Sequence, residues 1–224
     1  MFLATVTPVD QLPDLLLPAL RETLTMVGVV MVLVVSVGTP LGVLLHNTGP
    51  RGLFPRARVN APLSWVANLG RSLPFLVLMA TIIPFTRLLT GTTIGIWAAI
   101  VPMTVAGIPF FARLVENGLR EVPSEVTDVA RASGGSTMQI ILKAQVSEAL
   151  PALVAGVTLN SIAMLEYSAI AGTIGAGGIG FVAITYGYQR FDTNVMLATV
   201  LILVVLVQII QFSGDRIARR LKHA

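Results

Sequence analysis

Few side chains in this sequence have the type and spacing of a chemical site. Gly175, Gly177 and Gly180 match the G-x-G-x-x-G spacing with which dinucleotide-binding folds bring a pyrophosphate to a helix N-terminus. That assignment requires a preceding strand, which the pattern does not predict, so we interpret the glycines as a tight re-entrant or surface turn. His46 and His223 have no nucleophile or metal-ligand spacing nearby. We therefore expect no catalytic residues, no metal site and no cofactor bound by this chain.

Glu166 is the one acidic residue well inside an apolar stretch, where a carboxylate is costly unless it faces water or a partner. It is a candidate for lining a translocation path together with Tyr167 and Ser168, and it could meet the ammonium group of an amino acid. The alternative is that Glu166 lies near the outer end of its helix and contacts only water or a neighbouring helix.

The surrounding sequence is that of a membrane protein. Apolar residues make up 54% of the chain and charged residues 12%, and the mean hydropathy is +0.83. A soluble domain carries about twice that share of charge. We expect an all-α membrane protein that forms one domain, residues 1–224, because several apolar runs are long enough to cross a bilayer. The five predicted spans are 24–45, 63–85, 94–111, 151–170 and 195–212.

The basic residues orient these spans. Five spans place the termini on opposite sides of the membrane, and twelve of the fifteen Lys and Arg residues then fall on the side of the C-terminus. Only Arg21, Arg87 and Arg190 fall on the other side. The positive-inside rule therefore predicts an extracytoplasmic N-terminus and a cytoplasmic C-terminus. Topology thus explains the net charge of +4 without nucleic acid, and the absence of cysteine excludes disulfides.

Residues 118–150 are too charged for lipid and form a predicted cytoplasmic segment. Pro123 and Ser124 can start a helix there, and Gly134 with Gly135 ends it after about nine residues. A helix this short is not stable alone in water, so it must pack against something. It is either a docking element for a soluble partner or a loop that packs only on its own protein.

A second helix in this segment is predicted from a capping box, since Gln139 follows Ser136 at the required spacing. It is expected to run to Leu150, with Pro151 opening the next span. No G-x-x-x-x-G-K phosphate-binding sequence occurs in the chain. Active transport would therefore draw its energy from a partner or from an ion gradient.

The first short helix has an apolar face and a charged remainder. At helical spacing the apolar face is Val126, Val129 and Ala130, and the remainder carries Glu125, Asp128 and Arg131. This segment resembles the EAA loop of ABC importer permeases, a glutamate-alanine-alanine triplet followed after three residues by glycine. The matching residues are Asp128-Val129-Ala130 and Gly134, with Asp128 in place of glutamate and Val129 in place of the first alanine. Val146-Ser147 stands where that family has leucine-proline.

Further motifs resemble the methionine branch of these permeases and cover the chain from Arg71 to Arg216. They are Arg71-Ser72-Leu73-Pro74-Phe75, Ile83-Pro84-Phe85-Thr86-Arg87, Val101-Pro102, Pro109-Phe110-Phe111-Ala112-Arg113, Val115-Glu116-Asn117, Tyr167-Ser168-Ala169, Gly175-Ala176-Gly177-Gly178-Ile179-Gly180, Tyr186-Gly187-Tyr188 and Gln211-Phe212-Ser213-Gly214-Asp215-Arg216.

The resemblance implies the type I ABC importer permease fold, five transmembrane helices with a cytoplasmic coupling helix, in the bacterial inner membrane. It implies a homodimer joined by two ATPases, which bind ATP and Mg, and by an extracytoplasmic substrate-binding protein. The substrate would be D- or L-methionine, and the chain itself would not be an enzyme. The coupling residues would be Glu125, Val126, Asp128, Val129, Ala130 and Gly134. Two alternatives stay open: an ion-coupled secondary amino-acid carrier that uses Glu166, and a membrane scaffold that transports nothing.

Overall fold

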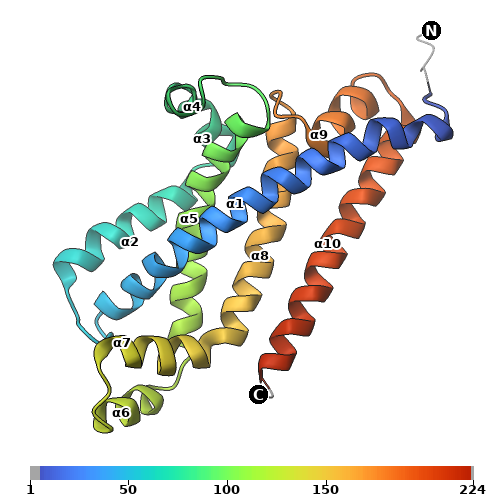
Figure 1. The fold of residues 1–224 in the computed structure, drawn as a ribbon. Coiled ribbons are helices and arrows are strands. Elements are labelled where there is room, and N and C mark those ends of the chain that lie inside the picture. The colour runs from blue at the N-terminus through green and yellow to red at the C-terminus, as the bar shows by residue number, and fades with distance from the viewer. Residues whose placement is uncertain (1–5, 223–224) are drawn as a thin grey trace. The chain divides into compact units, whose positions relative to one another are not determined.

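The computed structural model describes residues 6–222, and every regular element within them is a helix (Figure 1). The long helices are α1 (Leu12–Thr48), α2 (Ala57–Ser72), α5 (Ile96–Arg120), α8 (Ser147–Gly172) and α10 (Thr193–Lys222). The shorter ones are η1 (Val9–Gln11), α3 (Phe75–Thr81), α4 (Ile83–Thr90), α6 (Ser124–Ala132), α7 (Thr137–Gln139) and α9 (Gly178–Val182). Two π-helices, η2 (Ile140–Val146) and η3 (Ala183–Tyr188), follow α7 and α9. The all-α expectation is confirmed.

The chain divides into two compact units, each built from several segments. Unit 1 consists of Met1–Val32, Leu73–Ala106 and Ser161–Ile210. Unit 2 consists of Leu33–Ser72, Gly107–Asn160 and Gln211–Ala224. The helices α1, α5, α8 and α10 contribute residues to both units, whereas α6 and α7 belong to unit 2 and α9 belongs to unit 1.

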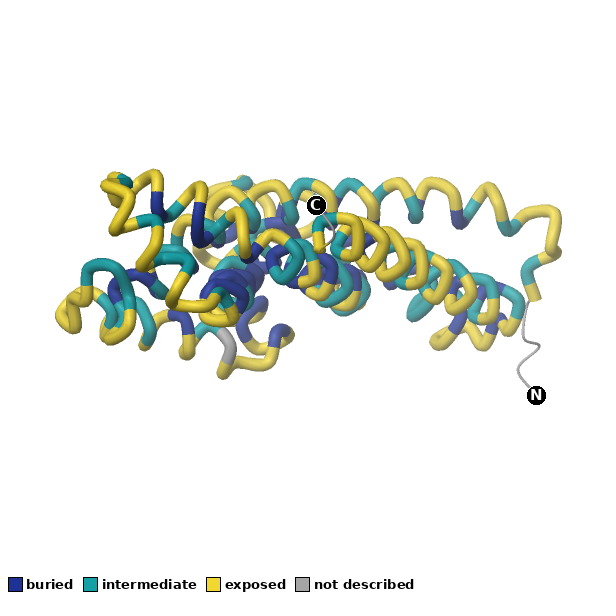
Figure 2. Tube along the Cα trace, turned by 90° about the horizontal axis from the view of Figure 1, so that it is seen from below, coloured by how far each residue is buried: buried dark blue, intermediate teal, exposed yellow. Residues whose placement is uncertain are grey.

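Four helical stretches are long and apolar enough to cross a membrane: 9–48, 96–120, 137–172 and 193–222. Segments 57–70 and 75–81 pass the same test together, so they make a fifth span when counted as one broken helix. Exposed residues, yellow in Figure 2, run along these helices and include many large apolar side chains. Lipid chains cover such surfaces, and helices satisfy their own backbone hydrogen bonds. The chain is therefore a multi-pass membrane protein.

The region expected as a single second span, 63–85, is divided among three helices. Pro74 has extended backbone torsions (φ −56°, ψ 135°) and precedes the first residue of α3. Because a proline disfavours helical torsions in the residue before it, α2 ends at Ser72. Ile82 separates α3 from α4, and Pro84 lies in the first turn of α4, where its missing amide is tolerated.

The helix does not break at Pro151, where the sequence predicts the start of a new span. The stretch 137–172 is one continuous helix with Pro151 inside α8, and its irregularity lies earlier, in the π-helix η2. One proline removes a single backbone hydrogen bond, which a long helix with packed neighbours tolerates. At the other end of the chain, α1 begins at Leu12, ahead of the predicted start at residue 24.

The core of unit 1 joins α1, α9 and α10 through a buried apolar cluster. Glu22 and Thr23 of α1 accept hydrogen bonds from the backbone amides of Gly178 (2.7 Å) and Ile179 (2.9 Å). Amides in the first turn of a helix have no partner inside that helix, so α1 caps α9. The glycine-rich stretch is thus a turn, in which Gly177 and Gly178 have positive φ.

The core of unit 2 brings α1, α2 and α5 together through Leu45, Ala67 and Ala112, all buried. A β-carbon at Gly42 would lie only 2.5 Å from the carbonyl oxygen of Ala112. The backbones of α1 and α5 therefore touch at this point, which small residues in membrane helices permit. This contact fixes the C-terminal ends of α1 and α5, between which part of the site described next is built.

Candidate functional site

The short helix α6 belongs to unit 2 and is largely exposed. It begins at Ser124, after Pro123, and ends at Ala132, so its nine residues match the predicted helix. Gly134 has φ +76°, and the amide of Gly135 donates to the carbonyl of Ala130 (3.1 Å), which closes the C-terminus. None of the nine residues is buried. A nine-residue helix without a buried residue is incompletely packed by its own chain.

The predicted apolar face of α6 is split in the structure. Val126 and Ala130, one turn apart, are partly buried, and α6 packs on η2. Val129 is 65% exposed. At 3.6 residues per turn, Val129 is rotated by about 60° from Val126, which places it at the edge of the sheltered side. Val129 therefore points outward with the charged residues Glu125 and Asp128.

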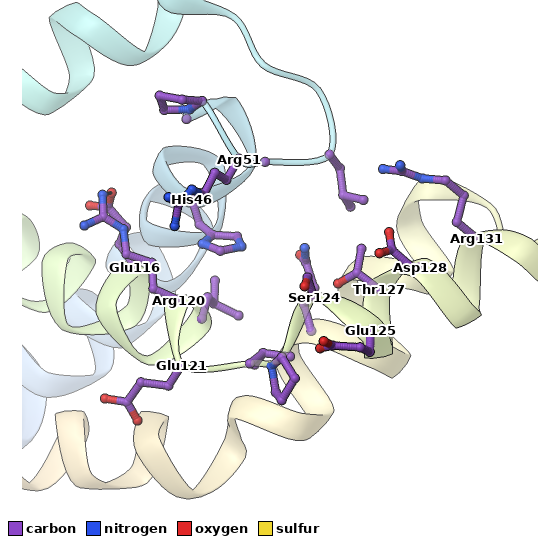
Figure 3. Close-up of a pocket in the computed structure, with 18 residues that line it drawn as sticks. His46, Arg51, Glu116, Arg120, Glu121, Ser124, Glu125, Thr127, Asp128 and Arg131 are labelled. Carbon is purple, nitrogen blue, oxygen red and sulfur yellow. Dashed lines mark hydrogen bonds and ion pairs between the residues drawn. The ribbon is translucent and has the colours of Figure 1, made fainter.

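An open cavity of about 960 Å³ separates α6 from the ends of α1 and α5 (Figure 3). The helix α6 contributes Ser124, Glu125, Thr127, Asp128 and Arg131 to its wall, and α5 contributes Glu116, Leu119 and Arg120. Residues 49–53 and 121–123, His46 and Gln145 complete it. Cations and carboxylates face this "α6 cavity" from both sides, as Figure 3 shows for Arg120 opposite the α6 residues. Of the predicted coupling residues, Glu125 and Asp128 line the cavity.

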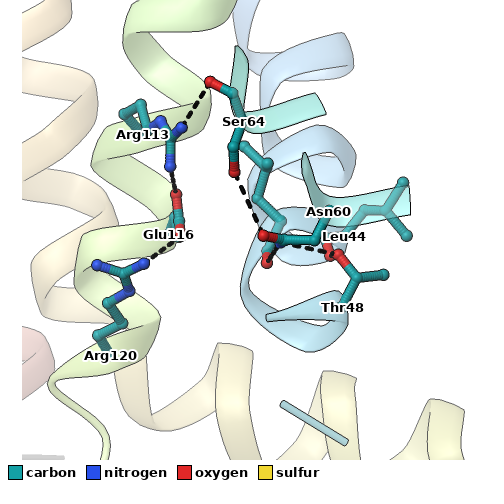
Figure 4. A network of polar contacts seen from close by, with 8 residues as sticks. Leu44, Thr48, Asn60, Ser64, Arg113, Glu116 and Arg120 are labelled. Atoms are coloured by element: carbon teal, nitrogen blue, oxygen red, sulfur yellow. Dashed lines mark hydrogen bonds and ion pairs between the residues drawn. The ribbon is translucent and has the colours of Figure 1, made fainter. Parts of the chain in front are cut away.

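Glu116, which lines the α6 cavity, is a buried carboxylate paired with two arginines (Figure 4). Glu116 is 2% exposed and accepts hydrogen bonds from Arg113 (2.5 Å) and Arg120 (2.6 Å). Arg113 also donates to the backbone carbonyl of Ser64 in α2 (2.8 Å). A buried carboxylate is tolerated when both oxygens are paired in this way. The network therefore holds α5 to α2.

A second buried contact joins the segment after α6 to α1. The side-chain amide of Asn47 donates to Oε1 of Gln145 (2.9 Å), and both residues are buried. Gln145 belongs to η2, and its side chain also lines the α6 cavity. Sequence reasoning missed this pair because the two residues are far apart in the chain and neither stands in a recognisable motif.

The capping box predicted in this segment is present. The hydroxyl of Ser136 accepts from the amide of Gln139 (3.4 Å), while the side chain of Gln139 accepts from the amide of Ser136 (2.9 Å). This pair starts the continuous helix 137–172 directly after Gly135. It therefore fixes where α6 ends and where the long helix begins.

The predicted path residues lie side by side on α8 in unit 1, but their side chains have different surroundings. Glu166 is exposed. The ring of Tyr167 stacks on Phe75 of α3, and the hydroxyl of Ser168, which is 2% exposed, donates to the carbonyl of Leu165 (2.7 Å). Of the three, Glu166 alone is exposed.

A cavity of about 300 Å³ in unit 1 has an apolar lining from α3, α4, α5 and the end of α8. Ala171 lines it from α8 and Ile174 from the turn that follows, whereas the three predicted path residues do not. Its walls are small and apolar residues, which the sequence offers no pattern to distinguish from ordinary packing. Within residues 6–222, no cluster of three or more His, Asp or Glu residues could hold a metal ion.

Comparison with known proteins places this architecture among transport permeases. Residues 38–223 match the family described as binding-protein-dependent transport system inner membrane component. The chain is 49% identical over 210 residues, 94% of its length and 93% of the relative's, to the probable D-methionine transport system permease protein of Vibrio cholerae. It is 40% identical over 174 residues, 78% of both chains, to the methionine import system permease protein of Bacillus subtilis.

A solved structure has the same fold. A crystal form of the MetNI methionine ABC transporter in an inward-facing conformation matches with a TM-score of 0.93 and 42% identity, over 96% of this chain and 99% of the matched chain. An amino acid ABC transporter crystallised with histidines matches with a TM-score of 0.72 at 18% identity, over 94% and 96% of the two chains, and this likeness concerns the fold alone.

Proposed function

Since the chain belongs to the family of binding-protein-dependent transport system inner membrane components, we propose that it is the permease of an ATP-binding-cassette importer for D- and L-methionine. The observation that carries this proposal is the agreement, over 96% of the chain, with a structure of a methionine ABC transporter. The names of the relatives point to the same substrate. This assignment is favoured over an ion-coupled secondary carrier, because the matching family and relatives are permeases of binding-protein-dependent systems.

The permease works with partners that supply energy and substrate. Two copies of the chain form the pathway, two ATPases bind ATP and Mg on the cytoplasmic side, and a substrate-binding protein delivers methionine from outside. The ATPases hydrolyse ATP. The permease contributes the translocation path and the contacts with the ATPases through which the path changes conformation. Each conformational state must bind the partners differently, since coupling requires differential affinity.

We propose that α6 is the element that the ATPase holds. Its exposure supports this, because a nine-residue helix without a buried residue gains stability when a partner covers it. The direct contact would be made by Glu125, Asp128 and Val129 from the exposed sides of the helix, with Val129 as the apolar anchor at 65% exposure. The partly buried residues Val126 and Ala130, and Gly134 at the end of the helix, complete the proposed coupling set.

The proposed orientation places the N-terminus outside and the C-terminus in the cytoplasm. With five spans, twelve of the fifteen Lys and Arg residues fall on the side of the C-terminus, and only Arg21, Arg87 and Arg190 fall on the other side. The positive-inside rule assigns the basic side to the cytoplasm. This orientation brings α6 to the side where ATP is available.

We propose Glu166, Tyr167 and Ser168 as part of the translocation path in unit 1. The exposed carboxylate of Glu166 supports this for the ammonium group of the substrate, since an intramembrane acid without water or a partner is costly. The stacked ring of Tyr167 and the bonded hydroxyl of Ser168 would fix the helix that presents Glu166.

Reconstitution in lipid vesicles tests the function directly. Vesicles with the permease, its ATPase and the binding protein are expected to take up labelled methionine only when ATP is present on the ATPase side. Unlabelled D- and L-methionine should compete, whereas lysine and glutamate should not. Uptake that persists without the ATPase and follows the membrane potential would instead identify an ion-coupled carrier.

A further inference from the structure

We propose that the buried side-chain amides of Asn47 and Gln145 are positioning residues that transmit the movement of α6 to α1. The inference rests on the proposed function, because it concerns how an ATPase holding α6 would move the membrane helices. The connection runs in three steps, from α6 to η2, from η2 to Asn47, and from Asn47 to the end of α1.

The first step is the packing of α6 on η2 within unit 2. A β-carbon added at Gly135 would lie 3.4 Å from the side chain of Ile140, so the turn after α6 lies directly on η2. Ile140 and Ala144 of η2 are buried, at 4% and 8% exposure. Figure 1 shows α6 folded back beside α7 at this end of unit 2. A displacement of α6 therefore pushes on a packed surface.

The second step is the hydrogen bond from Asn47 Nδ2 to Gln145 Oε1, at 2.9 Å. Asn47 is 0% exposed and Gln145 is 3% exposed, so this bond is shielded from bulk water although Gln145 borders the α6 cavity. Gln145 stands in a π-helical turn, an irregularity that occurs often at functional sites. A buried, directional bond of this kind holds η2 in one position along α1.

The third step fixes Asn47 to its own surroundings. Its side-chain amide also donates to the carbonyl of Val43 (3.0 Å), and its backbone carbonyl accepts from the amide of Phe54 (3.1 Å). Asn47 therefore moves together with the last turn of α1 and with the loop that leads to α2. Any shift of Gln145 is passed to both.

The pair is poorly explained as a stabilising core contact. Oδ1 of Asn47 is buried and has no hydrogen-bond partner among residues 6–222. An unpaired buried acceptor destabilises a fold, and two apolar side chains of similar volume would pack this site at lower cost. A polar pair that is costly at this site is better explained by the directional bond that it makes between η2 and α1 than by a gain in stability.

The experiment measures methionine taken up per ATP hydrolysed in vesicles containing the whole transporter. Gln145→Met keeps the side-chain volume and removes the acceptor, and we expect it to lower this ratio roughly fivefold while the ATPase still co-purifies and hydrolyses ATP. Asn47→Leu removes the donor and is expected to give the same loss; it supplies the readout if Gln145→Met does not assemble. The exchange variant Asn47→Gln with Gln145→Asn restores a pair and should recover at least half of the ratio.

Gln139→Ala is the matched control, because it removes the capping box of the same segment without touching α1. It should lower the melting temperature and leave uptake per ATP unchanged. The inference is overturned if Gln145→Met or Asn47→Leu retains the wild-type ratio, or if Gln139→Ala lowers the ratio as much as they do. If the wild-type transporter itself takes up no methionine with ATP, the proposed function fails, which is a separate result.

Discussion

The ring of Tyr167 lies parallel to the ring of Phe75, with 4.2 Å between their centroids and 2° between their planes. Phe75 is the first residue of α3 and is buried, and Tyr167 stands on α8. The stack therefore ties α3, which follows the break at Pro74, to the helix that carries the proposed path residues. Aromatic pairs of this kind contribute about 1 kcal/mol beyond the area that they bury.

Phe75→Ala is expected to destabilise unit 1, because it removes both the stack and a buried side chain. The loss should be about 3 kcal/mol. Tyr167→Phe keeps the ring and should melt like the wild type in detergent. Thermal unfolding followed by tryptophan fluorescence distinguishes them, and equal melting temperatures for all three proteins would show that the stack holds nothing in place.

Removing the charge of Glu116 should be costly. Glu116→Gln leaves Arg113, whose side chain is 13% exposed, without its carboxylate, and breaking a buried pair of this kind costs about 3–5 kcal/mol. Arg120→Ala removes an arginine that is 62% exposed on its side chain, so its cost should stay below about 1 kcal/mol. Chemical denaturation of the purified permease measures both. A larger loss for Arg120→Ala than for Glu116→Gln would contradict the assignment.

Gly134 is expected to be required for its left-handed backbone torsions, because there is room for a side chain at this position. Its φ is +76°, and an added β-carbon would meet nothing within 4 Å. Left-handed torsions cost a residue with a side chain about 1–2 kcal/mol, and Asn tolerates them better. Among the variants, ATPase binding measured by co-purification should therefore be strongest for Gly134→Asn, weaker for Gly134→Ala and weakest for Gly134→Val. If all three variants bound the ATPase equally well, α6 would not be part of the interface.

Glu166→Gln should raise the substrate concentration needed for half-maximal uptake, because it removes the charge proposed to meet the ammonium group. Glu148→Gln is the matched control, since Glu148 is another exposed acid on α8 and belongs to unit 2. Initial rates of methionine uptake at several concentrations give the comparison. If the two variants behave alike, Glu166 lies outside the path.

Asp192 should make the start of α10 sensitive to acid. Burial raises the pKa of Asp192, but hydrogen bonds from the Thr7 hydroxyl and from the amides of Val195, Thr7 and Asn194 outweigh burial and hold the pKa below its ordinary 3.8. The depressed pKa stabilises the fold above pH 3.8, and this stabilisation is lost as the pH falls through the folded-state pKa.

Hydrogen exchange of the Val195 amide, which donates to Asp192 Oδ1 (3.1 Å), reports this contact. We expect protection to be constant from pH 5 to 8 once intrinsic exchange rates are taken into account, and to fall only in stronger acid. Asp192→Asn should reduce the protection already at neutral pH. A loss of protection near pH 6 would require a different titrating group.

Helix start and stop signals in the sequence made part of this structure predictable. The bounds of α6 follow from Pro123 and Gly134, and the capping box of Ser136 and Gln139 forms as expected, because these signals act within one turn of helix. Pro74 divides the second span because its effect on the residue before it is equally local, yet apolar content alone predicted a single helix there.

Long-range contacts could not be predicted in the same way. The pairing of Asn47 with Gln145 depends on how segments far apart in the chain pack together, and no periodic pattern in the sequence predicts that packing. Pro151 predicted a helix start, but packing around α8 outweighs its single missing hydrogen bond. Helical spacing puts Val129 on one apolar face with Val126 and Ala130, whereas in the structure Val129 is 65% exposed and the other two are partly buried.

The cap that α1 provides for α9 has a consequence for the biogenesis of the protein. Glu22 precedes its partner Gly178 by 156 residues, so at 5–20 residues per second the ribosome needs about 8–30 s to deliver the second after the first. Throughout that time the carboxylate of Glu22 must be kept solvated. The glycine turn and α9 are therefore among the last parts of unit 1 to close, and a nascent chain arrested before residue 178 should leave Glu22 open to chemical modification.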